Sequence, residues 1–121
     1  MPSNPSKLHA AFVYYQRLRR VRDYVAQNYS DGVSLKRAAQ IASLEEKYFS
    51  AYFRQKTGIR FKEWVAEVRI THARAMMKSR NYNITEIAFA VGFRDLRTFE
   101  RAFKRHTGMT PRAFKNTVRP S

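Results

Sequence analysis

The sequence predicts an all-α protein built from two helix-turn-helix subdomains that a long helix joins. Three observations lead to this prediction. Glycine and proline are rare, with four of each in 121 residues, and alternating runs rich in Val, Ile and Thr are absent. Two similar units of about 30 residues occur one after the other, separated by a spacer. Each unit is bounded by residues that commonly cap helices.

The internal repeat covers both helices of each unit. The pattern Phe49-x-x-x-Phe53-Arg54-x-x-Thr57-Gly58 returns as Phe99-x-x-x-Phe103-Lys104-x-x-Thr107-Gly108. The upstream pattern Leu35-x-x-Ala38-Ala39-x-x-Ala42 returns as Ile84-x-x-Ile87-Ala88-x-x-Val91. Both copies therefore predict a short helix, a tight turn and a longer helix, which is the helix-turn-helix arrangement.

Capping residues set the expected helices of the first half. We expect a flexible tail at residues 1–7, an N-terminal subdomain at 8–58, and within it a first helix from about residue 7 to 28. Ser34 precedes a short helix at 35–41, and Ser43 with Glu46 resembles a capping box for a helix at about 45–56. Gly58 is expected to close that helix.

The second half repeats these signals. A linker helix is predicted within 61–80, with Trp64, Val65, Val68, Ala75 and Met76 as its main apolar stripe. In the C-terminal subdomain, at 83–118, Asn83 with Glu86 resembles a second capping box. Asp95 is expected to cap a helix at about 95–106, and Pro111 to open a last short helix.

The charge balance indicates a polyanionic partner. Lys and Arg number 24 against nine Asp and Glu, which gives a net charge of +15. Nucleic acid and an anionic membrane surface both meet this requirement. No apolar run is long enough to cross a membrane, and the N-terminus does not resemble a secretion signal. A cytoplasmic, nucleoid-associated location is therefore expected.

Catalysis and cofactor binding are not expected. The chain has no cysteine, and His9, His72 and His106 are too scattered for a metal site. Serine, histidine and acidic residues form no motif typical of an enzyme. His72 and His106 are interpreted as helix-surface or packing residues.

The longer helix of the second unit has one basic side. At 100° per residue, Phe99 and Phe103 form an apolar side. The opposite side carries Arg94, Arg97, Arg101, Lys104 and Arg105. Arginine commonly reads guanine in the major groove, so this side is expected to contact base edges. Glu100 lies beside it and is expected either to accept a hydrogen bond from cytosine or, as we favour, to pair with Lys104.

The longer helix of the first unit presents Lys47, Ser50, Ala51 and Arg54, with Gln55 at the edge of this face. Ser50 and Ala51 are short, so the helix can approach base edges closely.

The length of the linker helix also bears on how DNA is read. A helix of about 18 residues spans about 27 Å, against about 34 Å between successive major-groove segments. One chain is therefore expected to read two adjacent segments.

One stretch of motifs is more specific. It comprises Arg69-Ile70-x-x-Ala73-x-x-Met76-Met77, Ile84-Thr85-Glu86-Ile87-Ala88-x-x-Val91-Gly92-Phe93-x-Asp95, Phe99-x-Arg101-x-Phe103-Lys104-Arg105 and Gly108-Met109-Thr110-Pro111-x-x-Phe114-Lys115. It resembles the DNA-binding domain of the AraC/XylS family of bacterial transcription regulators, over residues 18–116. The resemblance implies seven helices in two subdomains. It also implies promoter DNA and RNA polymerase as partners. Members of the family often carry a separate effector-sensing or dimerisation domain, and no segment here is long enough to be one, so we expect either a stand-alone small regulator or a fragment of a longer chain.

The resemblance implies base contacts from the outward positions of the two longer helices, namely Lys47, Ser50, Ala51, Arg54, Leu96, Arg97, Glu100, Arg101 and Lys104. We further expect phosphate contacts from Ser34, Gln55, Thr98, Arg105, Arg112 and Lys115. The main alternative is a non-specific cationic DNA binder of the nucleoid type, whose affinity would ignore sequence and fall steeply with salt. A protein that lies on membranes is less favoured, because most apolar residues have partners within the chain.

Overall fold

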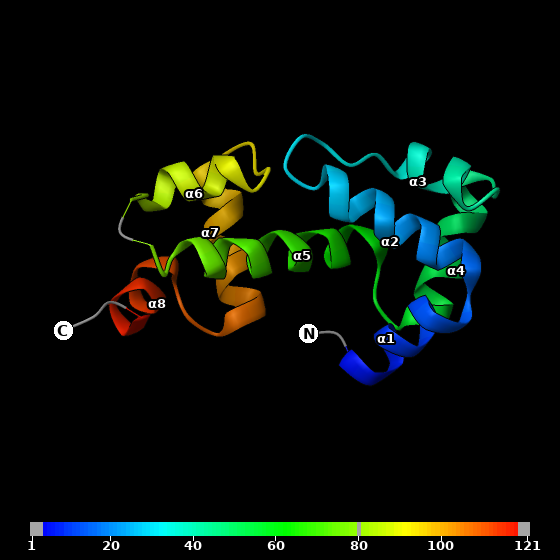
Figure 1. Cartoon of the computed structure of the whole chain (residues 1–121), viewed down its shortest axis with the longest axis horizontal. Coiled ribbons are helices and arrows are strands. Elements are labelled where there is room, and N and C mark those ends of the chain that lie inside the picture. The colour runs from blue at the N-terminus through cyan, green and yellow to red at the C-terminus, as the bar shows by residue number, and fades with distance from the viewer. Residues whose placement is uncertain (1–3, 80, 119–121) are drawn as a thin grey trace. The chain divides into compact units, whose positions relative to one another are not determined.

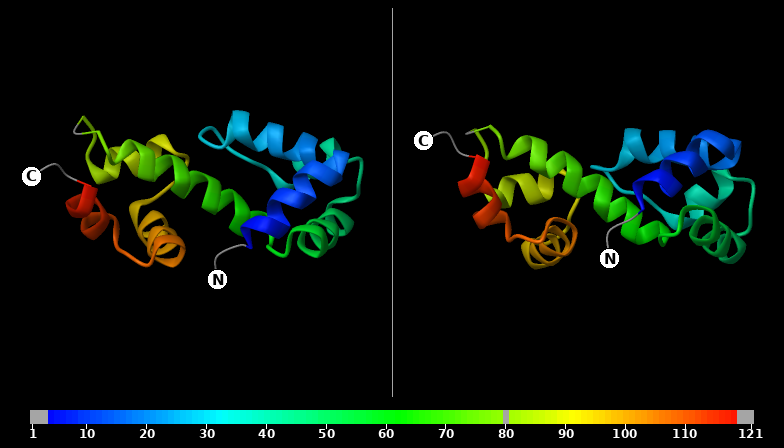
Figure 2. Two further views of the ribbon diagram at one scale, coloured as in Figure 1. Left: turned by 60° about the horizontal axis from the view of Figure 1, so that its bottom comes forward. Right: turned by 90° about the horizontal axis from the view of Figure 1, so that it is seen from below.

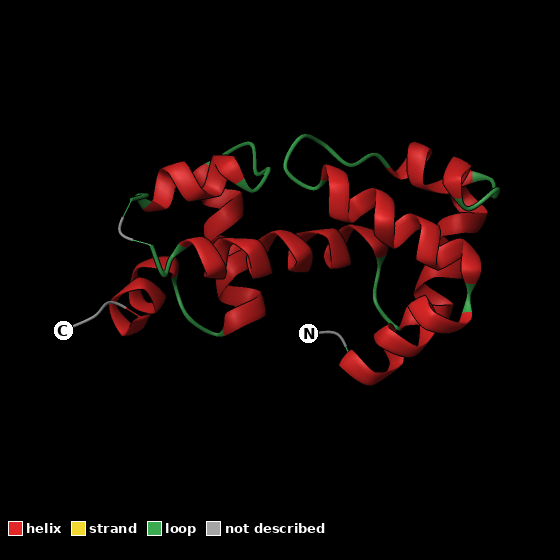
Figure 3. Ribbon diagram, in the orientation of Figure 1, coloured by secondary structure: helices red, strands yellow, loops and turns green. Residues whose placement is uncertain are grey.

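The computed structural model describes residues 4–79 and 81–118, which form eight helices and no strand (Figures 1 and 3). The helices are α1 (Pro5–Tyr14), α2 (Gln16–Asn28), α3 (Leu35–Ile41), α4 (Glu46–Thr57), α5 (Phe61–Met76), α6 (Ile84–Ala90), α7 (Leu96–Thr107) and α8 (Pro111–Val118). The predicted all-α class is confirmed. The described residues divide into two compact units, an N-terminal unit up to Val65 and a C-terminal unit from Ala66.

The first predicted helix is in fact two helices. Tyr15 has an extended backbone (φ −97°, ψ 110°) and separates α1 from α2, which accounts for the eighth helix. The apolar spacing runs through the break, so periodicity alone predicted one continuous helix. α1 also reaches into the expected tail, because the Asn4 side chain accepts hydrogen bonds from the amides of Ser6 and Lys7 and Pro5 suits the first turn. Residues 1–3 lie outside the described part of the chain.

Aromatic side chains fill the core of the N-terminal unit. Phe12, Phe49, Phe53, Phe61 and Trp64 are all buried. The ring centroids of Phe12 and Trp64 lie 4.9 Å apart, and those of Phe53 and Trp64 lie 5.4 Å apart. This packing holds α1 against α4, as both views of Figure 2 show. Ala11 and Phe12 of α1 are therefore buried within their own unit, whereas Val13 and Tyr14 remain exposed.

The core of the C-terminal unit is a chain of phenylalanines. Phe93 contacts Phe99, Phe99 contacts Phe103 and Phe103 contacts Phe114, with ring centroids 5.3 to 5.7 Å apart. Ile87 is fully buried beside them. These contacts join α6, α7 and α8 and fix the side of α7 that faces inward.

The apolar stripe of α5 differs from the predicted one. Its buried residues are Phe61, Trp64 and Val65 in the N-terminal unit and Ile70 and Ala73 in the C-terminal unit, where Met77, just beyond the end of the helix, is also buried. Val68 and Met76 are only half-buried, and Ala75 is exposed. One stripe was expected because the whole helix was assigned a single packing face. Each half of α5 instead belongs to a different core.

Most predicted caps are confirmed. Ser34 and Asp95 cap α3 and α7 with side-chain hydrogen bonds, and Asn83 with Glu86 forms a capping box on α6. The capping box expected at Ser43 and Glu46 is wrong, because α4 begins after Glu45 with no side-chain cap. Ser43 instead adopts a left-handed conformation (φ 58°) in the turn that ends α3.

His106 is a packing residue, as one of the two interpretations of the sequence held. Its side chain is only 3% exposed, and Nδ1 lies 3.8 Å from the Glu67 carboxylate. His72 lies on the surface of α5.

Candidate nucleic-acid interface

The exposed side of α7 is almost entirely cationic. Arg97, Arg101, Lys104 and Arg105 are all exposed, whereas Phe99, Ala102 and Phe103 are buried on the opposite side. The predicted facing of this helix is therefore confirmed. A narrow helix with long guanidinium side chains has the shape and charge to enter the major groove of DNA.

The start of α7 is fixed by Asp95. Its carboxylate accepts hydrogen bonds from the backbone amide of Thr98 at 2.7 Å and from the Thr98 hydroxyl at 2.9 Å. These two hydrogen bonds, with smaller contributions from Arg101 and Arg97, lower the pKa of Asp95 below its ordinary value. The backbone amide and hydroxyl of Thr98 both donate to Asp95, so neither points freely toward a phosphate.

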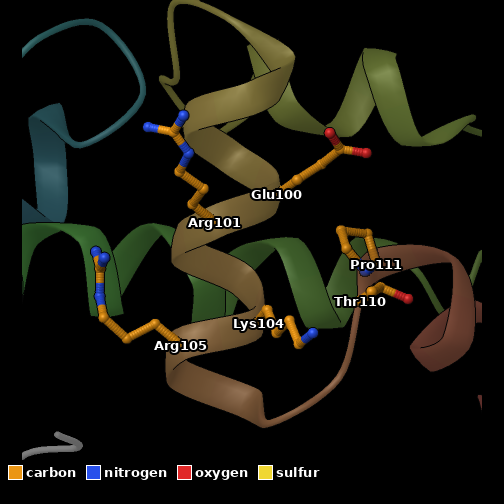
Figure 4. Close-up of a pocket in the computed structure, with 6 residues that line it drawn as sticks. All are labelled: Glu100, Arg101, Lys104, Arg105, Thr110 and Pro111. Carbon is orange, nitrogen blue, oxygen red and sulfur yellow. The ribbon is translucent and has the colours of Figure 1, made fainter.

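A shallow pocket lies between α7 and the start of α8 (Figure 4). Its lining comprises Glu100, Arg101, Lys104, Arg105, Thr110 and Pro111. In this view Glu100 and Lys104 extend from the side of α7 nearer to Pro111, and Arg101 and Arg105 extend from the other side.

The expected ion pair between Glu100 and Lys104 is absent among the described residues. Exposed pairs of this kind gain little, so neither side chain is constrained to the other. Glu100 keeps its acceptor atoms for a base or for solvent.

The outer face of α4 combines small and cationic side chains. Lys47, Ala51, Arg54 and Gln55 are exposed, which agrees with the predicted face. Ser50 is half-buried, and its hydroxyl donates to the Glu46 carbonyl at 3.3 Å. Ser50 therefore lies at the border of this face rather than at its centre.

The structure also places an aromatic side chain on the outer face of α4 that was not among the predicted residues. Tyr48 is 64% exposed and lies on the outer side of the helix, beyond Ala51. The same 100° projection that selected Ala51 would have found it. Its ring and hydroxyl are available to a ligand at this surface.

The remaining candidate phosphate contacts lie at scattered positions. Ser34 is the exposed N-cap of α3, Arg105 is exposed at the end of α7, and Arg112 is exposed near the start of α8. The Lys115 ammonium donates to the Tyr82 carbonyl at 2.8 Å, which ties α8 to the loop before α6. An ammonium has three donors, so this bond leaves Lys115 with capacity for a second acceptor.

Arg17, an exposed residue of α2, was likewise not among the predicted residues. Its guanidinium Nη1 donates to the carbonyls of Ala42 and Ser43, which lie in the turn between α3 and α4. A signal for it was present in the sequence. Arg17-Leu18 in the helix before the first helix-turn-helix corresponds to Arg69-Ile70 in the helix before the second.

Neither a metal site nor a membrane-spanning helix is found in the described part of the chain. Over residues 4–79 and 81–118, the acidic residues and histidines form no cluster that could hold a metal ion. Within the same ranges, no helix has the length and apolar character that crossing a bilayer requires.

Comparison with known proteins adds the family. A family model described as a helix-turn-helix domain matches residues 38–117. The chain belongs to the AraC family of helix-turn-helix DNA-binding domains. The HTH-type transcriptional regulator YobQ of Bacillus subtilis, named as uncharacterized, is 32% identical over 95 residues, which are 78% of this chain and 39% of YobQ. This AraC-type chain spans 29–39% of the length of the first curated relatives that it matches.

Solved structures agree with this assignment. The C-terminal domain of AraT, a response regulator from Geobacillus stearothermophilus, is similar with a TM-score of 0.79 and 28% identity, over 88% of this chain and 89% of that domain. The DNA-binding domain of AdpA, solved with a target DNA, has a TM-score of 0.77 and 23% identity, over 85% and 93%. At that identity the AdpA domain shows only the shared AraC-type fold.

Proposed function

We propose that this chain binds double-stranded DNA in a sequence-specific manner as the DNA-binding domain of a transcription regulator. The exposed face of α7 carries the proposal, because Arg97, Arg101, Lys104 and Arg105 lie together on the second helix of a helix-turn-helix unit. The same face has a single carboxylate, Glu100, which makes no ion pair among the described residues. Solubility alone would not require four positive side chains on one face, because a mixture of positive and negative side chains serves it as well.

Arg97 and Arg101 are the proposed base readers of α7, with Lys104 beside them. Arginine forms two parallel hydrogen bonds with the O6 and N7 atoms of guanine, which no other base pair offers in that pattern. The positions are four residues apart, so both side chains leave the same side of the helix. Arg105 lies at the edge of this face and is assigned to the phosphate backbone.

In the N-terminal unit, α4 is proposed to read a second block of sequence. Arg54 and Lys47 supply hydrogen-bond donors, and Ala51 offers a methyl group that suits the thymine methyl. Ser34, Gln55 and Arg112 are proposed to contact phosphates, as is Lys115, whose ammonium has donors left beside its bond to the Tyr82 carbonyl. Thr98 is not proposed for this role, because its amide and its hydroxyl both donate to Asp95.

The regulatory part of the proposal extends to promoters. The resemblance implies that such a domain acts beside RNA polymerase, and the AraC-type regulators that match this chain are longer proteins. Transcription in vitro from a promoter carrying the selected site, with and without this chain, tests that part. An unchanged transcript level would contradict a regulatory role of the chain by itself.

Selection of bound duplexes from a random DNA pool is the test of DNA reading. The pool should be presented at near-physiological salt with excess competitor DNA, because low salt favours charge-driven binding of any sequence. Two enriched blocks separated by about one helical turn are expected if α4 and α7 each read a groove.

Other outcomes of the selection contradict parts of the proposal. A single enriched block would contradict base reading by both helices. Enrichment of no sequence, together with tight binding at low salt, would contradict sequence-specific reading and favour the non-specific cationic binder, which the net charge of +15 also suits.

A further inference from the structure

The turn between α3 and α4 is a complete Schellman motif. The Ser43 amide donates to the Gln40 carbonyl at 3.0 Å, and the Leu44 amide donates to the Ala39 carbonyl at 2.9 Å. These two bonds place Ser43 at the position after the helix where the backbone becomes left-handed. The turn thereby ends α3 and sets the direction in which α4 departs.

The turn between α6 and α7 repeats the motif. The Gly92 amide donates to the Phe89 carbonyl and the Phe93 amide to the Ala88 carbonyl, both at 3.1 Å. Gly92 has the left-handed role here, with φ 107°. The two units therefore use one backbone device to orient their reading helices.

The residue at the left-handed position differs between the two units. Glycine has no Cβ and adopts positive φ without steric cost, whereas serine at φ 58° brings Cβ close to its own carbonyl oxygen. Among the described residues, Ser43 is the only residue other than glycine that has a positive φ. The first turn thus carries a strain that the second turn avoids.

Arg17 is in direct contact with the strained turn. Its Nη1 donates to the Ala42 carbonyl at 2.9 Å and to the Ser43 carbonyl at 3.3 Å. The last carbonyls of a helix have no partner within the helix, and a cation beside them is favoured by the helix dipole as well. The guanidinium therefore stabilises the two peptide groups that flank the left-handed bend.

A second arginine lies at a comparable position in the helix that precedes the C-terminal helix-turn-helix. Arg17 precedes the buried Leu18 as Arg69 precedes the buried Ile70. The Arg69 guanidinium carbon lies 5.8 Å from the ring centroid of Phe93, the residue that follows Gly92. Each unit thus has an arginine from its preceding helix at the helix-turn-helix turn.

We propose that Arg17 is a positioning residue for α4, which holds the carbonyls of Ala42 and Ser43 and so maintains a turn that lacks the glycine found in the second unit. Its effect on DNA reading rests on the proposed function. Its effect on the turn does not, and that effect is measurable without DNA.

The turn itself is tested by amide hydrogen exchange of the whole chain, followed by NMR at Leu44. Four variants form the test: Arg17→Ala, Arg17→Lys, Ser43→Gly and the double variant of Arg17→Ala with Ser43→Gly. Arg20→Ala is the matched control, because Arg20 is an exposed arginine of the same helix. The Phe93 amide of the second turn serves as an internal reference.

Arg17→Ala is expected to speed exchange at Leu44 about tenfold, the size that loss of a charge-assisted hydrogen bond produces. Exchange at Phe93 should not change. Arg17→Lys should restore part of the protection, and Ser43→Gly should remove most of the effect of Arg17→Ala, because glycine needs no support at positive φ. Equal effects of Arg17→Ala and Arg20→Ala, or no rescue by Ser43→Gly, would overturn the proposal.

DNA binding then tests the positioning role. Affinities are measured for the selected duplex and for a scrambled duplex of equal length. Arg17→Ala should reduce the ratio of the two affinities about tenfold, with rescue by Ser43→Gly, whereas Arg20→Ala should lower both affinities together. An unchanged ratio would overturn the positioning role even if the exchange results hold. If the unaltered chain prefers no sequence, the proposed function fails while the exchange experiment still decides on the turn.

Discussion

The two proposed reading helices, α4 and α7, have 12 residues each and both end at a left-handed glycine, but their starts and their exposed side chains differ. α7 starts with a side-chain cap from Asp95 and exposes long cationic side chains. α4 starts after Glu45 without a side-chain cap, and the centre of its outer face is Ala51. The same fold thus presents two different outer faces, both of which we propose as recognition surfaces.

This difference affects how each helix depends on its turn. Arginine side chains are long and flexible enough to reach base edges when the helix axis shifts slightly. A methyl group such as that of Ala51 contacts a base only if the backbone comes close, so the direction of α4 must be set accurately. The turn that sets this direction is the one that contains Ser43 and the bonds from Arg17.

The largest expected effect concerns the cores that hold the two helices. Phe53→Ala and Phe103→Ala each remove a fully buried ring and should each cost about 3–5 kcal/mol of unfolding free energy. Denaturant titration followed by circular dichroism measures both. The fluorescence of Trp64 should change in Phe53→Ala, because the ring centroids of Phe53 and Trp64 lie 5.4 Å apart. Phe89→Ala, at a residue that is 51% exposed, is the control. A Phe103→Ala variant of unchanged stability would contradict the facing of α7.

The next effect concerns base reading by α7. Arg101→Ala should weaken binding to the selected duplex by about 1–3 kcal/mol and relax the preference at one base pair. Titration against duplexes changed at each position in turn measures both quantities. An equal loss on all duplexes would instead assign Arg101 to the phosphate backbone.

The corresponding test of α4 enlarges a side chain instead of removing one. Ala51→Leu should weaken specific binding about tenfold, because the added atoms occupy the space between helix and base. Ala26→Leu, at an exposed alanine of α2 in the same unit, is the matched control and should bind normally. If both variants bind like the unaltered chain, α4 does not approach the bases closely and the contrast between the two helices is lost.

How far the sequence predicted this structure depends on whether a feature is local. Ser34, Asn83 and Asp95 were identified as caps because each interacts with residues three positions away in the sequence. Ser43 has the same local pattern, but it was already the last residue of the turn that ends α3. One residue cannot adopt the left-handed conformation and cap the next helix as well, and only the fold shows which role applies.

The same distinction holds for the candidate site. The exposed faces of α4 and α7 follow from a period of 3.6 residues, so the sequence predicted Ala51 and Arg101 correctly as outward residues. The bond from Arg17 to Ala42 joins residues 25 positions apart, so no local pattern indicates it, and only the recurrence of Arg17-Leu18 as Arg69-Ile70 could have pointed to Arg17. The break at Tyr15 was missed for a related reason, since packing of Phe12 on Trp64 and Phe53 directs α1 away from the axis of α2.

The smallest expected effect concerns the cap that α7 has and α4 lacks. Hydrogen bonds from Thr98 lower the pKa of Asp95 below its ordinary value of 3.8, so the charged carboxylate stabilises the folded state. This contribution is fully present above pH 3.8 and is lost as the pH falls through the lower pKa of the folded state. Asp95→Asn keeps an acceptor for the Thr98 amide but removes the charge. The free energy of unfolding of the variant should therefore fall less on acidification than that of the unaltered chain. Urea unfolding between neutral and strongly acidic pH measures the difference. If Asp95→Asn and the unaltered chain lose stability in parallel down to the lowest pH, the charge of Asp95 contributes nothing, and the two helices begin on equal terms.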